Sequence, residues 1–113
     1  MNLSSNLTEY EQIALNRFLT QVHELFNDDY RSAVLFGSKA RGDFHAESDI
    51  DVALFLRRVD RQIKRAIYDI ATEIFLETEI EIAPLIFQLD QYEQMRADGY
   101  PIVHEIERCK VTL

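Results

Sequence analysis

The sequence predicts an α/β (α+β) fold in which a small mixed β-sheet is flanked by helices. Helical and strand patterns alternate through the first 87 residues, and only three short segments have strand character. The chain has 113 residues, of which 47% are hydrophobic, and this is enough for one core without a metal or disulfide staple. We therefore expect a single domain spanning residues 1–113.

A first long helix is predicted to begin after Thr8. The segment Thr8-Glu9-Tyr10-Glu11 matches a capping box, in which the threonine side chain accepts from a backbone N–H and the glutamate reaches back to the cap. Apolar residues then follow at helical spacing up to about residue 26: Leu15, Phe18, Leu19, Val22, Leu25 and Phe26. This stripe should face the core, and Asn27-Asp28-Asp29 should end the helix.

Two strands are predicted next. Residues 32–36 are short and apolar and run into Gly37, which should end the first strand. Residues 49–56 have a period of two that places four aliphatic side chains on one face: Ile50, Val52, Leu54 and Leu56. The other face carries Asp49, Asp51, Ala53 and Phe55. The second strand should therefore have one apolar face and one mixed face.

A second long helix, a third strand and two short helices should complete the fold. Asp60 can cap the helix, whose apolar stripe consists of isoleucines: Ile63, Ile67, Ile70 and Ile74. Residues 80–87 resemble a strand, and Pro84 places that strand at a sheet edge or marks a bulge. Beyond Asp90, two short helical segments are separated by Gly99-Tyr100-Pro101.

Charge and composition exclude several classes of protein. The chain has 12 Lys+Arg and 20 Asp+Glu, and this net charge of −8 opposes direct binding to a long nucleic acid. No apolar run approaches the roughly 20 residues that a membrane helix needs, and the first residues lack the features of a signal peptide. The single cysteine, Cys109, excludes an intramolecular disulfide. These features predict a cytoplasmic protein without a membrane anchor.

The residues suited to chemistry lie between positions 37 and 51. Gly37 follows a buried strand and lets a ligand approach the backbone. If residues 39–41 form a helical turn, Ser38 is at its N-cap, and its hydroxyl and the free N–H groups form a small phosphate site. Asp49 and Asp51 project from one face of a strand, and such oxygen ligands suit Mg²⁺ together with waters and substrate phosphates. This is the outline of a metal–nucleotide site.

These residues resemble the motif of the minimal nucleotidyltransferases within the polymerase-β-like superfamily. That motif is Gly-Ser, ten residues and Asp-x-Asp, and Gly37-Ser38 and Asp49-Ile50-Asp51 fit it without a gap. Ala40-Arg41-Gly42 and Ser48 also agree with the family's usual form. The motif region covers about residues 34–56, and the expected order of helices and strands fits the family over most of the chain. The resemblance implies the nucleotidyltransferase (polymerase-β-like) fold.

The resemblance also implies the roles of the site residues. Asp49 and Asp51 would hold two Mg²⁺ ions, and Gly37 and Ser38 would hold the β- and γ-phosphates of ATP. Arg41 is a candidate for a further nucleotide contact, although an arginine in a turn is as often a surface residue. An acceptor hydroxyl would attack the α-phosphate, and pyrophosphate would leave in line.

A third carboxylate is expected on a neighbouring strand, where the family usually has aspartate. Glu81, between two isoleucines, is the matching residue, and it would complete the metal site. Glu77, Glu79 and Glu81 would share one face of an extended segment, so a slip of two residues would bring Glu79 into the site instead. Either Asp51 or Glu81 could take the proton of the acceptor.

The family includes the antitoxins of HEPN/MNT toxin–antitoxin pairs, which attach AMP from ATP to a tyrosine of the toxin RNase. They are similar in size to this chain, which shows no extra domain for holding a drug or a nucleic acid. The leading hypothesis is therefore an antitoxin that adenylylates a HEPN toxin. Two alternatives stay open: a non-catalytic antitoxin that neutralises by occlusion, and a nucleotidyltransferase for a small hydroxyl compound such as an aminoglycoside. The sequence does not determine the acceptor, the base preference or the oligomeric state.

Several other features have a structural and a functional interpretation. One basic cluster is either a solvated helix face or a docking patch for an acidic partner: Arg57, Arg58, Arg61, Lys64 and Arg65. The apolar edge at residues 85–87 and the segment 100–111 could join subunits or a partner. Three histidines lack partners at metal-ligand spacing and are expected at the surface: His23, His45 and His104. Cys109 has no local feature of a nucleophile.

Overall fold

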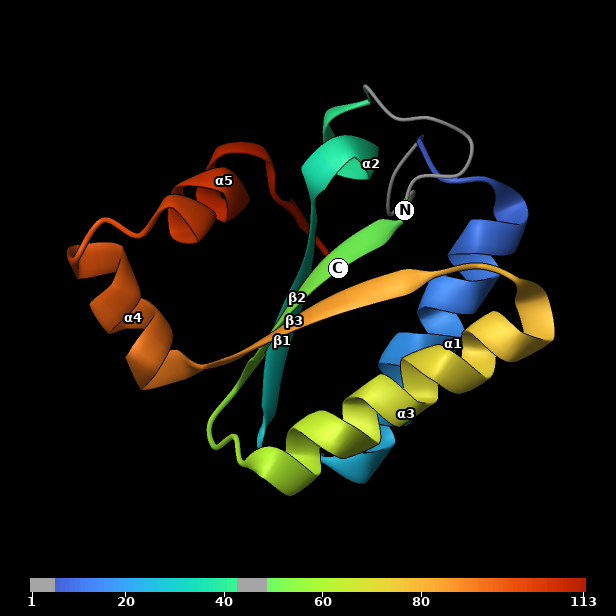
Figure 1. The fold of residues 1–113 in the computed structure, drawn as a ribbon, viewed down its shortest axis with the longest axis horizontal. Helices are drawn as coiled ribbons and strands as arrows, with labels where there is room; N and C mark the ends of the chain where they lie inside the picture. The colour runs from blue at the N-terminus through green and yellow to red at the C-terminus, as the bar shows by residue number, and fades with distance from the viewer. Residues whose placement is uncertain (1–5, 43–48) are drawn as a thin grey trace.

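The computed structural model describes residues 6–42 and 49–113, so the predictions for His45 and Ser48 lie outside the described part of the chain. Its elements in chain order are α1 (Glu9–Leu25), β1 (Tyr30–Phe36), α2 (Gly37–Arg41), β2 (Ile50–Leu56), α3 (Arg61–Thr78), β3 (Ile82–Gln88), α4 (Leu89–Ala97), α5 (Pro101–Cys109) and β4 (Val111–Thr112) (Figure 1). The alternation of helices and strands is as predicted. In these ranges no helix is both long and apolar enough to span a membrane.

The four strands form one mixed sheet in the order β3-β2-β1-β4. β1 is antiparallel to β2 and to β4, whereas β2 and β3 are parallel and are connected through α3. β3 lies at an edge of the sheet, which is the position that Pro84 favours because proline has no N–H to donate to a second neighbour. The sheet is therefore small and mixed, as the sequence predicts.

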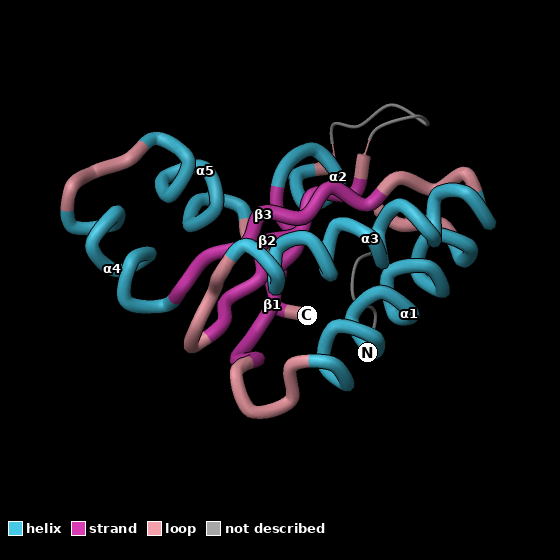
Figure 2. Tube along the Cα trace, turned by 60° about the horizontal axis from the view of Figure 1, so that its bottom comes forward, coloured by secondary structure: helices cyan, strands magenta, loops and turns pink. Residues whose placement is uncertain are grey.

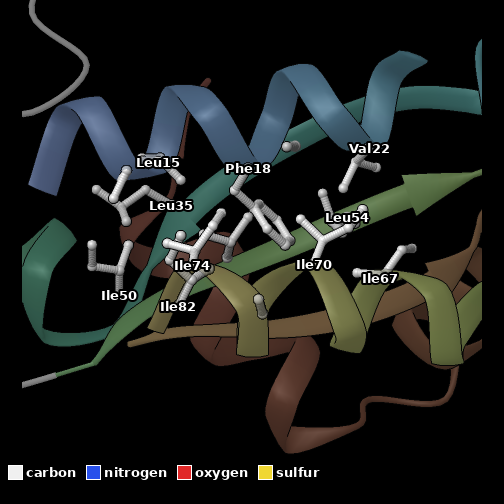
Figure 3. Close-up of a cluster of buried hydrophobic side chains, with 14 of the residues drawn as sticks. Leu15, Phe18, Val22, Leu35, Ile50, Leu54, Ile67, Ile70, Ile74 and Ile82 are labelled. Atoms are coloured by element: carbon white, nitrogen blue, oxygen red, sulfur yellow. The ribbon is translucent and has the colours of Figure 1, made fainter. Parts of the chain in front are cut away.

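Helices cover both faces of the sheet. α1 and α3 pack side by side on one face, and α4 and α5 lie on the other (Figures 1 and 2). The larger core lies under α1 and α3 and includes most of the predicted stripes of both helices, with Phe18, Ile67 and Ile74 fully buried (Figure 3). The prediction that Leu25 faces the core is wrong, because Leu25 is the last residue of α1 and its side chain is 59% exposed. A smaller core lies under α4 and α5: Val34, Phe36, Ala53, Phe55, Tyr92, Val103 and Ile106. Consequently β2 has apolar side chains on both faces.

The caps of the two long helices are confirmed. The Glu11 backbone N–H donates to Thr8 Oγ1 over 3.1 Å, and the Thr8 backbone N–H donates to Glu11 Oε1 over 2.9 Å, which completes the capping box. Asp60 Oδ1 accepts from the Ile63 N–H at 2.8 Å and caps α3. These local bonds explain why the sequence predicts where both helices begin.

The predicted basic cluster is divided by the fold into two groups. Arg57 and Arg58 follow β2 and form ion pairs with Asp29, at 2.7 and 3.7 Å. Arg61, Lys64 and Arg65 are exposed along the first turns of α3, and within residues 6–42 and 49–113 they have no ion-pair partner. The second group therefore leaves its positive charge unneutralised at the surface of an acidic chain.

Candidate active site

The helical turn predicted after the first strand, the candidate phosphate site, is present as α2. β1 leads directly into it, and Gly37 has φ +74°, a conformation that glycine adopts at little cost. The cap residue is Phe36, which is extended and whose side chain makes no capping bond, so Ser38 lies inside the first turn. The prediction of Ser38 as the N-cap is therefore wrong, because the chain turns one residue earlier, at the glycine.

The two aspartates lie at the start of β2. Asp51 is in register with Phe36, the last residue of β1, so its carboxylate is beside the beginning of α2. It is half-buried on the face of the sheet that α4 and α5 cover, whereas Asp49 precedes the strand and is exposed. The structure thus brings Asp51 beside the beginning of α2, whereas Asp49, which is predicted within the same strand, lies one residue before it.

Gly37 and Asp51 are packed directly against each other. A Cβ atom added to Gly37 would overlap Asp51 Oδ2 and would lie 3.0 Å from Asp51 Cγ. No side chain fits between this backbone and the carboxylate, so Gly37 is required by close approach as well as by its φ angle. The turn and the carboxylate are therefore in direct contact.

Burial and nearby charges shift the pKa of Asp51. Burial raises the pKa of Asp51, and the negative charges of Asp49 and Glu105 raise it further, whereas Arg41 lowers it. Arg41 Nη1 lies 2.5 Å from Glu105 Oε2, which joins α2 to α5. Arg41 is exposed at the end of α2, and its positive charge lowers the pKa of Asp51. It can therefore reach an anion bound at the turn.

The structure rejects one proposed position for the third carboxylate. Glu77 belongs to α3, and Glu79 is the left-handed cap of that helix with φ +62°, so neither lies on an extended segment. The alternative of a slip that brings Glu79 into the site is wrong, because the helix continues further than the isoleucine stripe indicates. Glu81 remains the candidate.

Glu81 adjoins the site at its edge. Its backbone carbonyl accepts from the Ile50 N–H at 3.0 Å, which continues the parallel pairing of β2 and β3 by one residue. Its side chain is exposed and lines a groove that also contacts Phe75 and Pro84. Among the residues described, no three acidic, histidine or cysteine side chains come close enough to hold one metal ion. Glu81 is thus near Asp49 in the sheet, but its carboxylate does not join the aspartate pair.

Sequence reasoning missed Lys39, the third residue of α2. Its side chain is 1% exposed, and Nζ lies 2.9 Å from Glu11 Oε2 in α1. The backbone carbonyl of Lys39 also accepts from Asn6 Nδ2 at 2.9 Å. A lysine in a glycine-containing turn suggests a phosphate ligand, but here the ammonium group points into the protein. No local sequence pattern indicates this pairing, because Glu11 lies 28 residues earlier.

The residues present fit a magnesium ion. Asp49 and Asp51 offer hard carboxylate oxygens, and Mg²⁺ is usually bound by one or two carboxylates with waters and substrate phosphates. The pKa of Asp51 is raised partly by the charge of Asp49, and a cation beside both groups would relieve this repulsion. The pair therefore suits a metal that substrate phosphates complete, without a closed cage of protein ligands.

A carboxylate pair at the end of a mixed sheet, packed against a short glycine-containing turn, is the arrangement of a nucleotidyltransferase site. The family model described as "Polymerase beta, Nucleotidyltransferase" matches residues 20–110, which is most of the chain. The chain belongs to this family, and the resemblance seen in its motif is confirmed.

Relatives and solved structures agree with this assignment. Two proteins of Methanocaldococcus jannaschii, each named a "putative protein adenylyltransferase", are 32% and 34% identical over 75 and 79 residues. Both matches cover 66% of this chain, and they cover 76% and 52% of the relatives. A structure described as a toxin-antitoxin with AMP-PNP superposes with a TM-score of 0.57 at 14% identity, over 84% of this chain and 68% of the other. A nucleotidyltransferase structure from Sulfolobus solfataricus, described as putative, has a TM-score of 0.51 at 14% identity, over 94% and 86% of the two chains. At this identity the two structures show the shared fold.

Proposed function

We propose that this chain is a Mg²⁺-dependent protein adenylyltransferase that transfers AMP from ATP to a tyrosine of a HEPN-type RNase toxin, and so acts as its antitoxin. The observation that carries the proposal is the close contact of Gly37 with Asp51, the residues to which we assign phosphate binding and metal binding. The names of the M. jannaschii relatives support a protein as acceptor. The fold shared with a toxin–antitoxin complex holding AMP-PNP supports ATP and a toxin partner.

The geometry suggests a separate catalytic role for each residue of the site. The free N–H groups at the start of α2, with the Ser38 hydroxyl and Arg41, bind the triphosphate. Mg²⁺ held by Asp49 and Asp51 would supply charge neutralisation. The tyrosine oxygen forms a bond to the α-phosphorus as the bond from that phosphorus to the bridging oxygen breaks, and pyrophosphate leaves. The hydroxyl proton passes to a carboxylate, either Asp51 or Glu81.

Intact-protein mass spectrometry tests the proposal. A candidate HEPN partner protein is incubated with the chain, Mg²⁺ and ATP, and in parallel with the Asp49→Asn/Asp51→Asn variant. We expect an AMP-sized gain in the mass of the HEPN protein only with the unmutated chain, and a loss of transfer by orders of magnitude in the variant, because both candidate metal ligands are changed. Peptide mapping then identifies the modified residue.

A control mixture contains both proteins and ATP but no Mg²⁺. Complex formation between the two proteins is measured in every mixture. An unmodified HEPN protein, with rapid transfer to a small alcohol under the same conditions, contradicts the proposal and favours a small-molecule acceptor. A gain in mass that is unchanged in the double variant shows that the aspartates are not the catalytic carboxylates.

A non-catalytic antitoxin is the second candidate, and one observation favours it. Glu81 replaces the aspartate usual in the family, and its carboxylate does not join Asp49 and Asp51 within the described part of the chain. If the chain neutralises by occlusion, the Asp49→Asn/Asp51→Asn variant still binds the toxin and still blocks its RNase activity. If it is an enzyme, neutralisation is lost together with the transfer of AMP.

A further inference from the structure

A buried ion pair links the candidate phosphate-binding turn to the beginning of α1. Lys39 is the most buried charged side chain of the described residues, at 1% exposure, and its partner Glu11 is also buried. Ala40 of the same helix also packs against the core under α1 and α3, whereas Ser38 is half-buried and Arg41 is exposed. The Lys39 ammonium group therefore cannot touch a bound phosphate unless it leaves Glu11.

Glu11 uses both of its carboxylate oxygens. Oε1 accepts the backbone N–H of Thr8 at 2.9 Å and completes the capping box of α1, whereas Oε2 accepts from Lys39 Nζ at 2.9 Å. The same glutamate thus fixes the first turn of α1 and the middle of α2. Asn6 adds a third connection, because its amide donates to the Lys39 carbonyl over 2.9 Å and packs within 3.4–3.7 Å of a Cβ position at Gly42.

A five-residue helix needs such support. Isolated helices of this length are not stable in water, so the position of α2 depends on tertiary contacts. The position is also demanding, because Gly37 in the same turn is packed against the Asp51 carboxylate without room for a methyl group. A shift of α2 would therefore change the geometry of the turn and of the carboxylate together.

Stability alone does not explain the buried pair. Removing two charges from water costs about as much as their attraction returns, and apolar residues of similar size often stabilise a core equally well. What an ion pair adds is a defined position, because each group is costly to bury without the other. The residues that flank the pair on α2 are the proposed nucleotide-binding residues, so the position that it fixes is that of the phosphate-binding turn.

From this geometry we infer that Lys39 and Glu11 are positioning residues of the nucleotidyltransferase site: their buried ion pair holds α2 in the place where its turn meets the triphosphate and Asp51. The inference rests on the proposed function for the link to nucleotide binding. It assigns to the segment 6–11 a place in the architecture of the site, although none of these residues belongs to the Gly-Ser and Asp-x-Asp motif.

Hydrogen–deuterium exchange of the free protein and calorimetric titration with MgATP test the inference. The variants are Glu11→Gln, Lys39→Met and the double variant, and each keeps the approximate shape of the side chain. We expect the amides of residues 37–42 to exchange about tenfold faster in each single variant, because local opening of α2 becomes easier, while residues 61–78 are unaffected. The affinity for MgATP should fall by about tenfold or more, as the turn moves relative to Asp51.

The double variant separates a pair that acts as one unit from two independent effects. A coupled pair gives about the same tenfold change in the double variant as in either single variant, whereas independent effects would multiply to about a hundredfold. The double variant also removes both buried charges, so it is the one that folds if a lone charge does not. Ile74→Val, in the core under α1 and α3, is the control: it weakens global stability and leaves both the exchange of residues 37–42 and the MgATP affinity unchanged.

Different failures have different meanings. If Glu11→Gln leaves MgATP affinity intact and Lys39→Met alone lowers it, Lys39 is a phosphate ligand and the inference is overturned. Unchanged exchange of residues 37–42 in all three variants overturns it as well. If the unmutated chain does not bind MgATP, the proposed function fails, and the exchange data by themselves still decide whether the ion pair positions α2.

Discussion

Substitution of Gly37 by alanine is the most informative change in the candidate site. Gly37 has φ +74°, and an added Cβ would overlap Asp51 Oδ2 and lie 3.0 Å from Asp51 Cγ and 3.2 Å from Asp51 Cβ. Non-bonded carbon atoms prefer separations of about 3.5–4.0 Å. The carboxylate of Asp51 must therefore move by about 0.5–1 Å, or α2 must move away from β2.

The expected effects on stability and on activity differ in size. A left-handed conformation costs alanine about 1–2 kcal/mol relative to glycine, which would lower the free energy of unfolding by that amount. A displacement of about 1 Å between reacting groups costs roughly a hundredfold in rate. Gly37→Ala should therefore reduce the rate of AMP transfer about a hundredfold, far more than the small change in the folded fraction can explain.

Gly99 provides a matched control for the cost of placing alanine in a left-handed backbone conformation. Its φ is +75°, nearly the same as that of Gly37, but nothing lies within 4 Å of a Cβ at this position. Gly99→Ala should lose a similar free energy of unfolding in urea denaturation and keep its rate of AMP transfer. Equal transfer rates in the Gly37→Ala and Gly99→Ala variants would refute the reasoning, because the contact with Asp51 is the difference between them.

Three further predictions concern stability and partner binding. Tyr92 Oη donates to Glu107 Oε2 at 2.7 Å and holds the pKa of Glu107 below its ordinary value, so this contribution is present above about pH 4.5 and is lost as the pH falls through the lowered pKa. In urea denaturation, Tyr92→Phe should cost about 1 kcal/mol at pH 7 and clearly less near pH 3; an equal cost at both would contradict this linkage. Thr8→Ala should cost about 1 kcal/mol by loss of the α1 cap, measured in the same way, and an unchanged free energy of unfolding would show that the capping box is dispensable. Reversal of charge at Lys64 and Arg65 should slow association with an acidic partner about tenfold at low salt and weaken its salt dependence, and unchanged stopped-flow rates would assign these residues to a solvated face.

The elements that the sequence predicts well are those specified by nearby residues. The capping box at Thr8, the cap at Asp60 and, apart from Leu25, the stripes of both long helices depend on positions three or four residues apart, and the structure confirms them. The alternation in residues 50–56 likewise reports the two faces of β2. The tertiary contacts of these elements agree with their local preferences, so local patterns are enough to predict them.

The features that the sequence does not predict depend on residues far apart in the chain. β4 has two residues and exists through its pairing with β1, so it has no period to recognise. The end of α3 at Thr78 lies beyond the isoleucine stripe, and this moved Glu79 out of the extended segment expected there. The inward direction of Lys39 follows from a glutamate in another helix.

Glycine placement explains why the site is nevertheless recognisable from a short motif. The three glycines of the chain all have positive φ, and two of them, Gly37 and Gly42, lie at the two ends of α2. Gly37 is packed against Asp51 without room for a Cβ, whereas Gly42 lies at ordinary contact distance from Asn6 and is favoured by its φ of +90°. The contact of Gly37 with Asp51 joins the turn to the neighbouring strand β2. The residues that determine this part of the site therefore lie within positions 37–51. The position of Glu81, by contrast, depends on the length of α3 and on the parallel pairing of β3, and no motif of that size can encode it.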